Sequence, residues 1–189
     1  MNDATLADQM FDIPLTRVDE PDKTVTLRDL SGAQPIHVVL LRQLNCPFCQ
    51  VHLGEVLRRS DDVGRIVVVS FADHERTLEY GYKLPPGVML VRDEPRNLYA
   101  ASKARRGNLW SVLLRPQILA KVAYFATRGM LTLPPKEDAF QLGADIVFDV
   151  HGRVVMKYVS KTADDRPSVD MIVAAMHVAR SGIEVRTAA

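Results

Sequence analysis

Two cysteines, Cys46 and Cys49, are the only thiols in this chain of 189 residues, and a proline and a phenylalanine separate them. A pair at this spacing is typical of reversible dithiol–disulfide chemistry or of half a metal site. Structural zinc usually takes four ligands, and the chain has no second pair of this kind. His52 and His74 are the candidates to complete a site, but we expect His52 on the solvated face of its helix. The pair therefore favours redox chemistry over zinc, with a non-catalytic pair as the remaining alternative.

The elements on either side of the pair give it a position in the fold. Residues 36–41 form a short apolar, β-branched run that predicts a buried strand. After the pair, Cys49, Leu53, Val56 and Leu57 share one face of a helix. The pair is therefore expected where a strand passes into a helix. A helix N-terminus carries free N–H groups and the positive end of the helix dipole, so it stabilises a thiolate.

This position predicts different roles for the two cysteines. With Cys46 at the N-cap, Pro47 occupies the first helical position, where its missing N–H costs nothing. We expect Cys46 to be exposed, with a pKa in the range of about 3.5–7.5 found for such thiols against about 8.5 for a free one. Cys49 begins the apolar stripe and is expected to be more buried and closer to an ordinary thiol. Cys46 would attack, and Cys49 would resolve the sulfenic acid or mixed disulfide.

Arginines near the pair are candidates to stabilise the thiolate. Arg42 lies four residues before Cys46, at the end of the predicted strand, and is included as a candidate catalytic residue. A solvated arginine at a strand end is an equally simple interpretation and is slightly favoured. Arg115 and Arg128 are alternative sources of positive charge, and the sequence does not choose among the three.

Composition excludes several classes of function. Hydrophobic residues make up 47% and charged residues 25% of the chain, as in ordinary globular proteins, and the net charge of +1 gives no general attraction to nucleic acid or anionic membranes. The polar first ten residues do not form a secretory signal, and no apolar run is long enough to span a bilayer. We expect a soluble, cytoplasmic protein that binds neither nucleic acid nor membrane.

The order of predicted elements defines the fold class. We expect one domain over residues 1–189, with a core at about 11–180 and an insertion at about 107–142 that contains a helix at 117–126. Asp73, Asp93 and Ser168 are predicted helix N-caps, and Gly107 and Gly182 predicted helix ends. The expected strands cover residues 13–16, 24–27, 36–41, 65–71, 88–91, 144–150 and 153–159. One expected helix begins directly after Cys46. Four more are expected at residues 73–82, 93–107, 117–126 and 168–182.

Three segments resemble the peroxiredoxin-like branch of the alkyl hydroperoxide reductase/thiol-specific antioxidant group, which includes the prostamide/prostaglandin F synthase-like proteins. They are Leu41–Cys49, Gly143–Arg153 and Asp165–Asp170, and with the order of elements the resemblance covers roughly residues 11–180. It implies a thioredoxin-like α/β fold: a central mixed sheet flanked by helices, an N-terminal hairpin, and an insertion before a C-terminal strand–strand–helix unit.

The resemblance also implies an activity. It implies an antioxidant thiol oxidoreductase without a cofactor, which reduces a small peroxide or disulfide and is recycled by an external dithiol of the thioredoxin or glutathione type. Cys46 then corresponds to the nucleophile and Cys49 to its partner, and a homodimer is allowed. Gln43 replaces the hydroxyl residue that typical peroxiredoxins have at this position, so a redox-sensing or thiol-exchange module with little turnover is the alternative. Residues 107–142 are a candidate wall of a substrate pocket.

Overall fold

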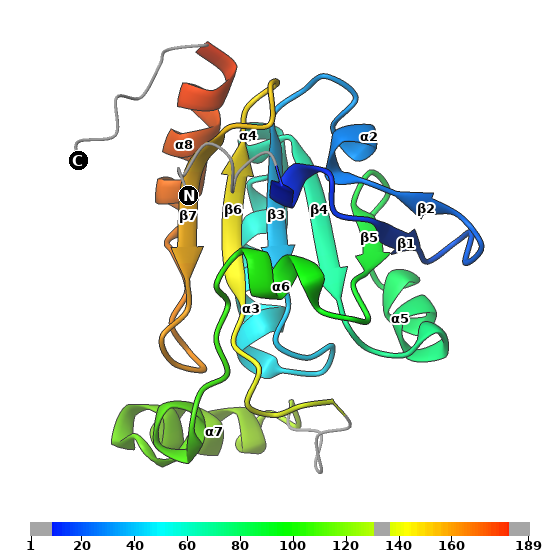
Figure 1. Cartoon of the computed structure of the whole chain (residues 1–189). Helices are drawn as coiled ribbons and strands as arrows, with labels where there is room; N and C mark the ends of the chain where they lie inside the picture. The colour runs from blue at the N-terminus through cyan, green and yellow to red at the C-terminus, as the bar shows by residue number, and fades with distance from the viewer. Residues whose placement is uncertain (1–8, 131–136, 182–189) are drawn as a thin grey trace.

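The structure is a computed structural model that describes residues 9–130 and 137–181. Its seven strands form one mixed sheet, in the order β2-β1-β5-β4-β3-β6-β7 (Figure 1). Strands β3, β4 and β5 are parallel to one another, whereas β6 and β7 form an antiparallel hairpin on the other side of β3. The strands are β1 (Leu15–Arg17), β2 (Thr24–Val25), β3 (Ile36–Leu40), β4 (Arg65–Ser70), β5 (Met89–Arg92), β6 (Ala144–Phe148) and β7 (Val154–Val159).

Helices cover both faces of the sheet. Helices α3 and α8 contribute Leu53 and Ile172 to a core on one face, and α6 contributes Tyr99 to the core on the other. No helix in the described ranges is long and apolar enough to cross a membrane. The helices are α2 (Leu27–Ser31), α3 (Pro47–Arg58), α4 (Ser60–Val63), α5 (His74–Gly81), α6 (Asn97–Ala101), the π-helical turn η1 (Trp110–Leu114), α7 (Pro116–Thr127) and α8 (Val169–Ser181).

The central strand β3 is apolar except for His37, because both of its faces are buried. Val38 and Leu40 pack into the core beneath α6, and Val39, between them, packs into the core beneath α3 and α8. This explains why the run 36–41 shows no polar alternation and yet forms a strand. The carboxyl end of β3 leads directly to the cysteine pair.

Helix α7 lies beyond the end of the sheet at which β3 terminates (Figure 1). Its bounds agree with the helix predicted at 117–126. Its apolar residues Ile118 and Phe125 join the core cluster that contains both cysteines. The segment between α6 and β6 therefore contributes side chains directly to the surroundings of the pair.

Helices α2 and α6 differ from the sequence prediction. Helix α2 was not predicted, although Thr26 and Asp29 form a capping box at its start, a signal that the sequence contained. The helix predicted from Asp93 to Gly107 is only Asn97–Ala101, because Arg96 and Lys103 adopt left-handed conformations on either side of it.

The predicted N-caps have mixed outcomes. Asp73 caps α5 as predicted, by accepting a hydrogen bond from the Arg76 N–H at 2.9 Å. Asp93 lies outside α6, but its carboxylate still accepts hydrogen bonds from the backbone N–H groups of Asn97 and Leu98, the first two residues of α6. The predicted end of the last helix, at residue 182, lies outside the described residues.

Candidate redox site

The cysteine pair lies at the strand–helix junction, as the sequence predicts. Cys46 is the N-cap of α3, with extended backbone angles of φ −70° and ψ 116°, and Pro47 is the first helical residue. The Cys46 carbonyl accepts the first helical hydrogen bond from Gln50 at 3.0 Å. Both cysteines are free thiols. The backbone thus sets Cys46 at the positive end of the helix, and Cys49 follows within the first turn.

The predicted exposure of Cys46 is wrong. Cys46 is 3% exposed and Cys49 is 1% exposed, so both side chains are buried. Both cysteines belong to a core cluster that includes Ile118 and Phe125 of α7, and the Phe125 ring packs edge-on against Phe48 with centroids 5.2 Å apart. A helix N-terminus is often open to solvent, but here it lies within a packed core.

Arg42 contacts the Cys46 sulfur and is not solvated. Its Nη1 donates to Cys46 Sγ at 3.2 Å, and the residue is 4% exposed. Backbone carbonyls hold the rest of the guanidinium: Nε donates to Gln141 at 3.2 Å and Nη2 to Ala139 at 2.9 Å. The candidate is therefore placed beside the thiol, and the competing interpretation of a solvated strand end is wrong, because carbonyls that precede β6 take the place of water.

Arg166, which sequence reasoning missed, contacts the other sulfur. It lies between β7 and α8, and its Nη2 donates to Cys49 Sγ at 3.4 Å and to the Leu40 carbonyl at 3.2 Å. Its Nη1 forms an ion pair with Asp145 at 3.0 Å. The residue is 117 positions from Cys49, so no local spacing could have indicated the contact.

Asp145 on β6 binds three side chains on the Cys49 side of the site. One carboxylate oxygen accepts hydrogen bonds from His37 Nε2 at 3.0 Å and His52 Nε2 at 2.8 Å, and the other meets Arg166. Burial opposes the charge of Asp145, but these two histidines and the Arg166 guanidinium hold its pKa well below the usual range. The expected solvated position of His52 is wrong because the buried carboxylate draws its ring inward.

Gly143 makes room for this arrangement. A Cβ atom at this position would overlap both the Arg166 guanidinium and the Leu40 carbonyl. Any larger residue would force Arg166 away from Cys49. Glycine therefore permits the close approach at the start of β6.

The two thiols share their protonation. A hydrogen bond from Cys46, helped by the charges of Arg166 and Arg42, lowers the pKa of Cys49 well below its ordinary value against the cost of burial. The same hydrogen bond, burial and the charge of Cys49 raise the pKa of Cys46 well above its ordinary value. The first proton to leave thus comes from a coupled pair, with the thiolate at Cys49. These directions are opposite to the predicted order; the main cause of both shifts is the hydrogen bond between the two sulfurs, and the Arg166 charge adds to the lowering of the Cys49 pKa.

The other residues considered as thiolate partners or zinc ligands do not contact either sulfur in the hydrogen bonds and ion pairs of the site. Arg115 is exposed at the N-cap of α7, and Arg128 is exposed and stacks over the Tyr124 ring at 5.0 Å. The other zinc candidate, His74, begins α5. Within residues 9–130 and 137–181, no group of three or more histidine, cysteine or acidic side chains is arranged to hold a metal.

A large groove lies beside the cysteine pair, and we call it the α3–α7 groove. It has a volume of about 800 Å³. Helix α3, the segment from α7 to Met130 and the loop before α8 form its walls, so part of the predicted insertion does line a cavity next to the site. Its lining residues are Phe48, Val51, His52, Glu55, Lys121, Tyr124, Phe125, Arg128, Met130, Asp164, Arg166, Pro167 and Ser168.

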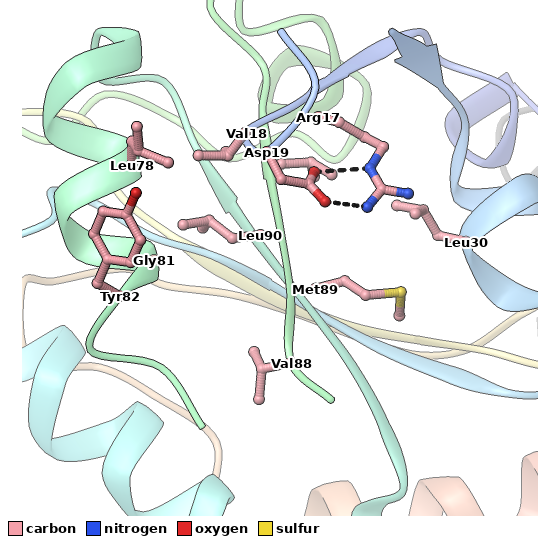
Figure 2. A pocket seen from close by; sticks show the side chains of 11 residues that line it. Arg17, Val18, Asp19, Leu30, Leu78, Gly81, Tyr82, Val88, Met89 and Leu90 are labelled. Carbon is pink, nitrogen blue, oxygen red and sulfur yellow. Dashed lines mark hydrogen bonds and ion pairs between the residues drawn. The ribbon is translucent and has the colours of Figure 1, made fainter. Parts of the chain in front are cut away.

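A second cavity, of about 320 Å³, lies away from the cysteines, between β1, α5 and β5 (Figure 2). Figure 2 shows apolar side chains such as Leu78 and Leu90 around it. Its charged groups, Arg17 and Asp19, are already paired, with Arg17 Nε donating to Asp19 at 2.8 Å. This cavity offers no nucleophile, so the chemistry centres on the cysteines.

Comparison with known proteins gives a match at the level of structure. No protein-family model and no curated protein matches the chain. Peroxiredoxin Q from Xanthomonas campestris is 18% identical, with a TM-score of 0.61 over 94% of this chain and 98% of that one. Prx3 from Vibrio vulnificus, in its reduced form, is 11% identical, with a TM-score of 0.61 over 88% of this chain and 94% of that one.

A third solved structure leads to the same fold. A thiol peroxidase from Chromobacterium violaceum is 12% identical, with a TM-score of 0.59 over 90% of this chain and 85% of that one. These likenesses confirm the mixed α/β sheet flanked by helices that the sequence predicts. The chain has the thioredoxin-like fold that these peroxiredoxin structures share.

Proposed function

We propose that the protein is a thiol-dependent oxidoreductase that reduces a peroxide or a disulfide through Cys46 and Cys49. One observation carries the proposal: two adjacent buried thiols at a helix N-terminus each contact an arginine, Arg42 at 3.2 Å and Arg166 at 3.4 Å. Cations beside a thiol favour the thiolate, which is the reactive form. The peroxiredoxin and thiol peroxidase structures of the same fold support the same chemistry.

The proposed cycle passes electrons from an external dithiol to the substrate. A thiolate of the pair attacks a peroxide oxygen, which breaks the O–O bond, releases an alcohol or water and leaves a sulfenic acid, or it attacks a disulfide sulfur, which releases one thiol and leaves a mixed disulfide. The second thiol then displaces water from the sulfenic acid or the remaining substrate thiol, to leave a Cys46–Cys49 disulfide. A dithiol of the thioredoxin type, or two molecules of a monothiol such as glutathione, then reduces this disulfide and leaves as a disulfide. Such a cycle suits a reducing compartment such as the cytoplasm.

Arg42 is the proposed third catalytic residue. Its guanidinium is held by the carbonyls of Gln141 and Ala139, so it stays in place while the charge on the Cys46 sulfur changes. Neutral carbonyls leave its full positive charge available to the sulfur. Which cysteine attacks first stays a prediction, with Cys46 as the attacking thiol and Cys49 as the resolving thiol.

Burial favours a second candidate, a redox sensor or thiol-exchange module with little turnover. Both thiols are nearly inaccessible, at 3% and 1% exposure. A substrate must therefore enter through a groove or a local opening, and slow entry would limit turnover.

A thiol titration tests the proposal. Reduced protein receives one equivalent of hydrogen peroxide, an alkyl hydroperoxide or a small disulfide, and free thiols are counted before and after, with Cys46→Ser and Cys49→Ser alongside. We expect both thiols to disappear in the wild type, and repeated turnover when a dithiol is added. Loss of thiols without turnover supports the sensor, and two thiols that survive all three oxidants contradict both functions.

A further inference from the structure

A third cavity is lined by basic residues, and we call it the basic cavity. Its volume is about 630 Å³, within the range of about 300–1,000 Å³ typical of small-molecule sites. One wall is the chain that leads from α6 toward α7, and the other is the end of β7 with the residues that follow it (Figure 1). Neither cysteine belongs to its lining. The basic cavity is therefore separate from the redox site.

The charges around the basic cavity all have the same sign. None of the described residues that line it is acidic, and the cations of its lining are Lys103, Arg105, Arg106, Lys157 and Lys161. The whole chain has 24 basic and 23 acidic residues, so this is a local concentration of positive charge and not the property of a basic protein. Like charges repel one another, and an anion inside the cavity relieves that repulsion.

Most of these cations are available to a ligand. Only Arg106 among them has an acidic partner within the described part of the chain, since its Nε lies 3.1 Å from an oxygen of Asp138. The other four side chains are exposed and form no ion pair with a described residue. In the α3–α7 groove, by contrast, Lys121 is paired with Asp164 at 2.6 Å. The basic cavity thus has positive charge that no described acidic side chain neutralises.

Backbone hydrogen bonds fix the two walls that carry the cations. The Leu142 N–H donates to the Arg105 carbonyl at 3.1 Å, which joins the first wall to the chain that precedes β6. The Ser160 N–H donates to the Gly143 carbonyl at 3.0 Å, which joins the second wall to the same segment. Because one segment holds both walls, the cavity is formed before a ligand arrives, and binding costs less ordering of the chain.

Neutral donors complete the lining of the basic cavity. Ser160 is 3% exposed, and its Oγ has no hydrogen-bond partner within the described residues. A buried hydroxyl without a partner costs stability, and its hydrogen rotates to suit an acceptor. Asn108 Oδ1 accepts from the Ser111 N–H at 2.9 Å, which leaves the NH₂ group of this amide to donate. Charged and neutral donors together match the several oxygen acceptors of a phosphate group.

We propose that the basic cavity binds a small molecule that carries two or more phosphate groups. A phosphate group carries about 1.5–2 negative charges at neutral pH, so two of them balance the four unpaired cations. The guanidinium of Arg105 suits the paired oxygens of a phosphate, and the lysines add point charges. A closed cavity suits a compact ligand, whereas a nucleic-acid strand requires an extended groove. The inference needs no step at the cysteines and is independent of the proposed redox function.

Calorimetric titration of the wild-type protein tests the class of ligand. The probes are pyrophosphate, inorganic phosphate, citrate and a short single strand of DNA, each at low and at high salt. We expect one pyrophosphate per chain, bound about tenfold more tightly than phosphate or citrate, and weaker binding at high salt because the cations are exposed. No binding of pyrophosphate, or equal binding of citrate, would overturn the phosphate class. Tighter binding of the DNA strand would overturn the small-molecule assignment.

Charge reversals locate the site. Arg105→Glu and Lys161→Glu, one from each wall, should each weaken pyrophosphate binding about tenfold or more, the size of a lost hydrogen bond to a charged group. Arg58→Glu and Lys83→Glu make the same changes of charge at exposed positions outside the basic cavity and should leave the affinity nearly unchanged. Equal losses in all four variants, or no loss in the two cavity variants, would overturn the site. Circular dichroism checks that each variant folds.

Ser160→Ala separates binding from folding. Because it removes an unpaired buried hydroxyl, we expect the melting temperature without ligand to stay the same or rise, while the affinity for pyrophosphate falls about tenfold. Ser31→Ala is the matched control: Ser31 is also buried, but its Oγ donates to the Arg28 carbonyl at 2.8 Å. This control should lower the melting temperature and keep the affinity. The same pattern in Ser160→Ala would show a structural hydroxyl and overturn its role in the site.

Discussion

The two sides of the cysteine pair are built from the same kind of contact but from different parts of the chain. On one side Arg42 contacts Cys46 and is held by neutral backbone carbonyls. On the other, Arg166 contacts Cys49 and is held by the buried carboxylate of Asp145. Both arrangements join distant parts of the chain, since the carbonyls that hold Arg42 are 97 and 99 positions from it and Arg166 is 117 positions from Cys49; they differ in the group that holds each arginine. The difference shows that equal charges beside two sulfurs need not have equal effects.

The surroundings of each arginine explain this. Burial disfavours the charge of Arg166, but Cys49 and Asp145 outweigh it and raise the pKa of the guanidinium. Asp145 in turn depends on His37, His52 and Arg166 for its own charge. The Cys49 side is thus a network in which each group needs the others, whereas Arg42 is a single contact held by the backbone.

Removal of Asp145 should give the largest effect. The variant Asp145→Ala leaves the Arg166 guanidinium buried without its counter-charge, and breaking a buried pair in this way costs about 3–5 kcal/mol of unfolding free energy. Urea denaturation measures the loss. As a control, Asp12→Ala breaks the exposed pair with Arg28 and should cost about 0–1 kcal/mol. Similar losses for the two variants would contradict the network.

Acid should expose the same network in the wild type. The pKa of Asp145 is lower in the folded protein than in the unfolded chain, so its contribution to stability is complete above the unfolded value of about 3.9 and is lost as the pH falls below it. His37, His52 and Arg166 are the titratable groups that face it. Between pH 5 and 3 we expect the stability of Asp145→Asn to fall less than that of the wild type by about 1 kcal/mol, because each pH unit below the unfolded pKa removes about 1.4 kcal/mol. Parallel curves would contradict this.

Arg166→Met should lower the reactivity of Cys49 as well as the stability of the fold, because it also breaks the buried pair with Asp145. A nearby cation lowers a thiol pKa by about 1–3 units, so we expect alkylation of Cys49 by iodoacetamide at neutral pH to fall about tenfold or more. The measurement is made in the Cys46→Ser background, where Cys49 is the single thiol. Arg166→Lys serves as the conservative variant and should recover part of the rate. An unchanged rate in Arg166→Met would show that Arg166 does not act on the sulfur.

Arg42→Met should give the smallest effect on the thiolate. In the Cys49→Ser background we expect alkylation of Cys46 to fall by about threefold, because burial opposes ionisation of this sulfur whether or not the cation is present. A larger loss here than in Arg166→Met would reverse the comparison between the two sides. Comparing the two arginine variants at the same pH makes the test direct.

Local signals in the sequence were sufficient for most elements. The apolar run at Ile36 predicted β3, the proline after Cys46 predicted the start of α3, and Asp73 predicted the cap of α5. Each depends on backbone preferences over a few residues, which persist whatever the rest of the chain does. The capping box at Thr26 was equally local and could have predicted α2.

What the sequence by itself determined is thus the strand–helix junction and the place of Cys46 at the helix N-terminus. Only the tertiary structure decided the electrostatics: it buried both thiols in a core cluster that includes side chains of α7, placed His52 against Asp145, and brought Arg166 against Cys49. The physical reason is the sequence separation of the groups that interact. Hydrogen bonds of turns and caps join near neighbours in sequence, whereas the charge and burial around a thiol are sums over every group nearby in space, from whatever part of the chain it comes.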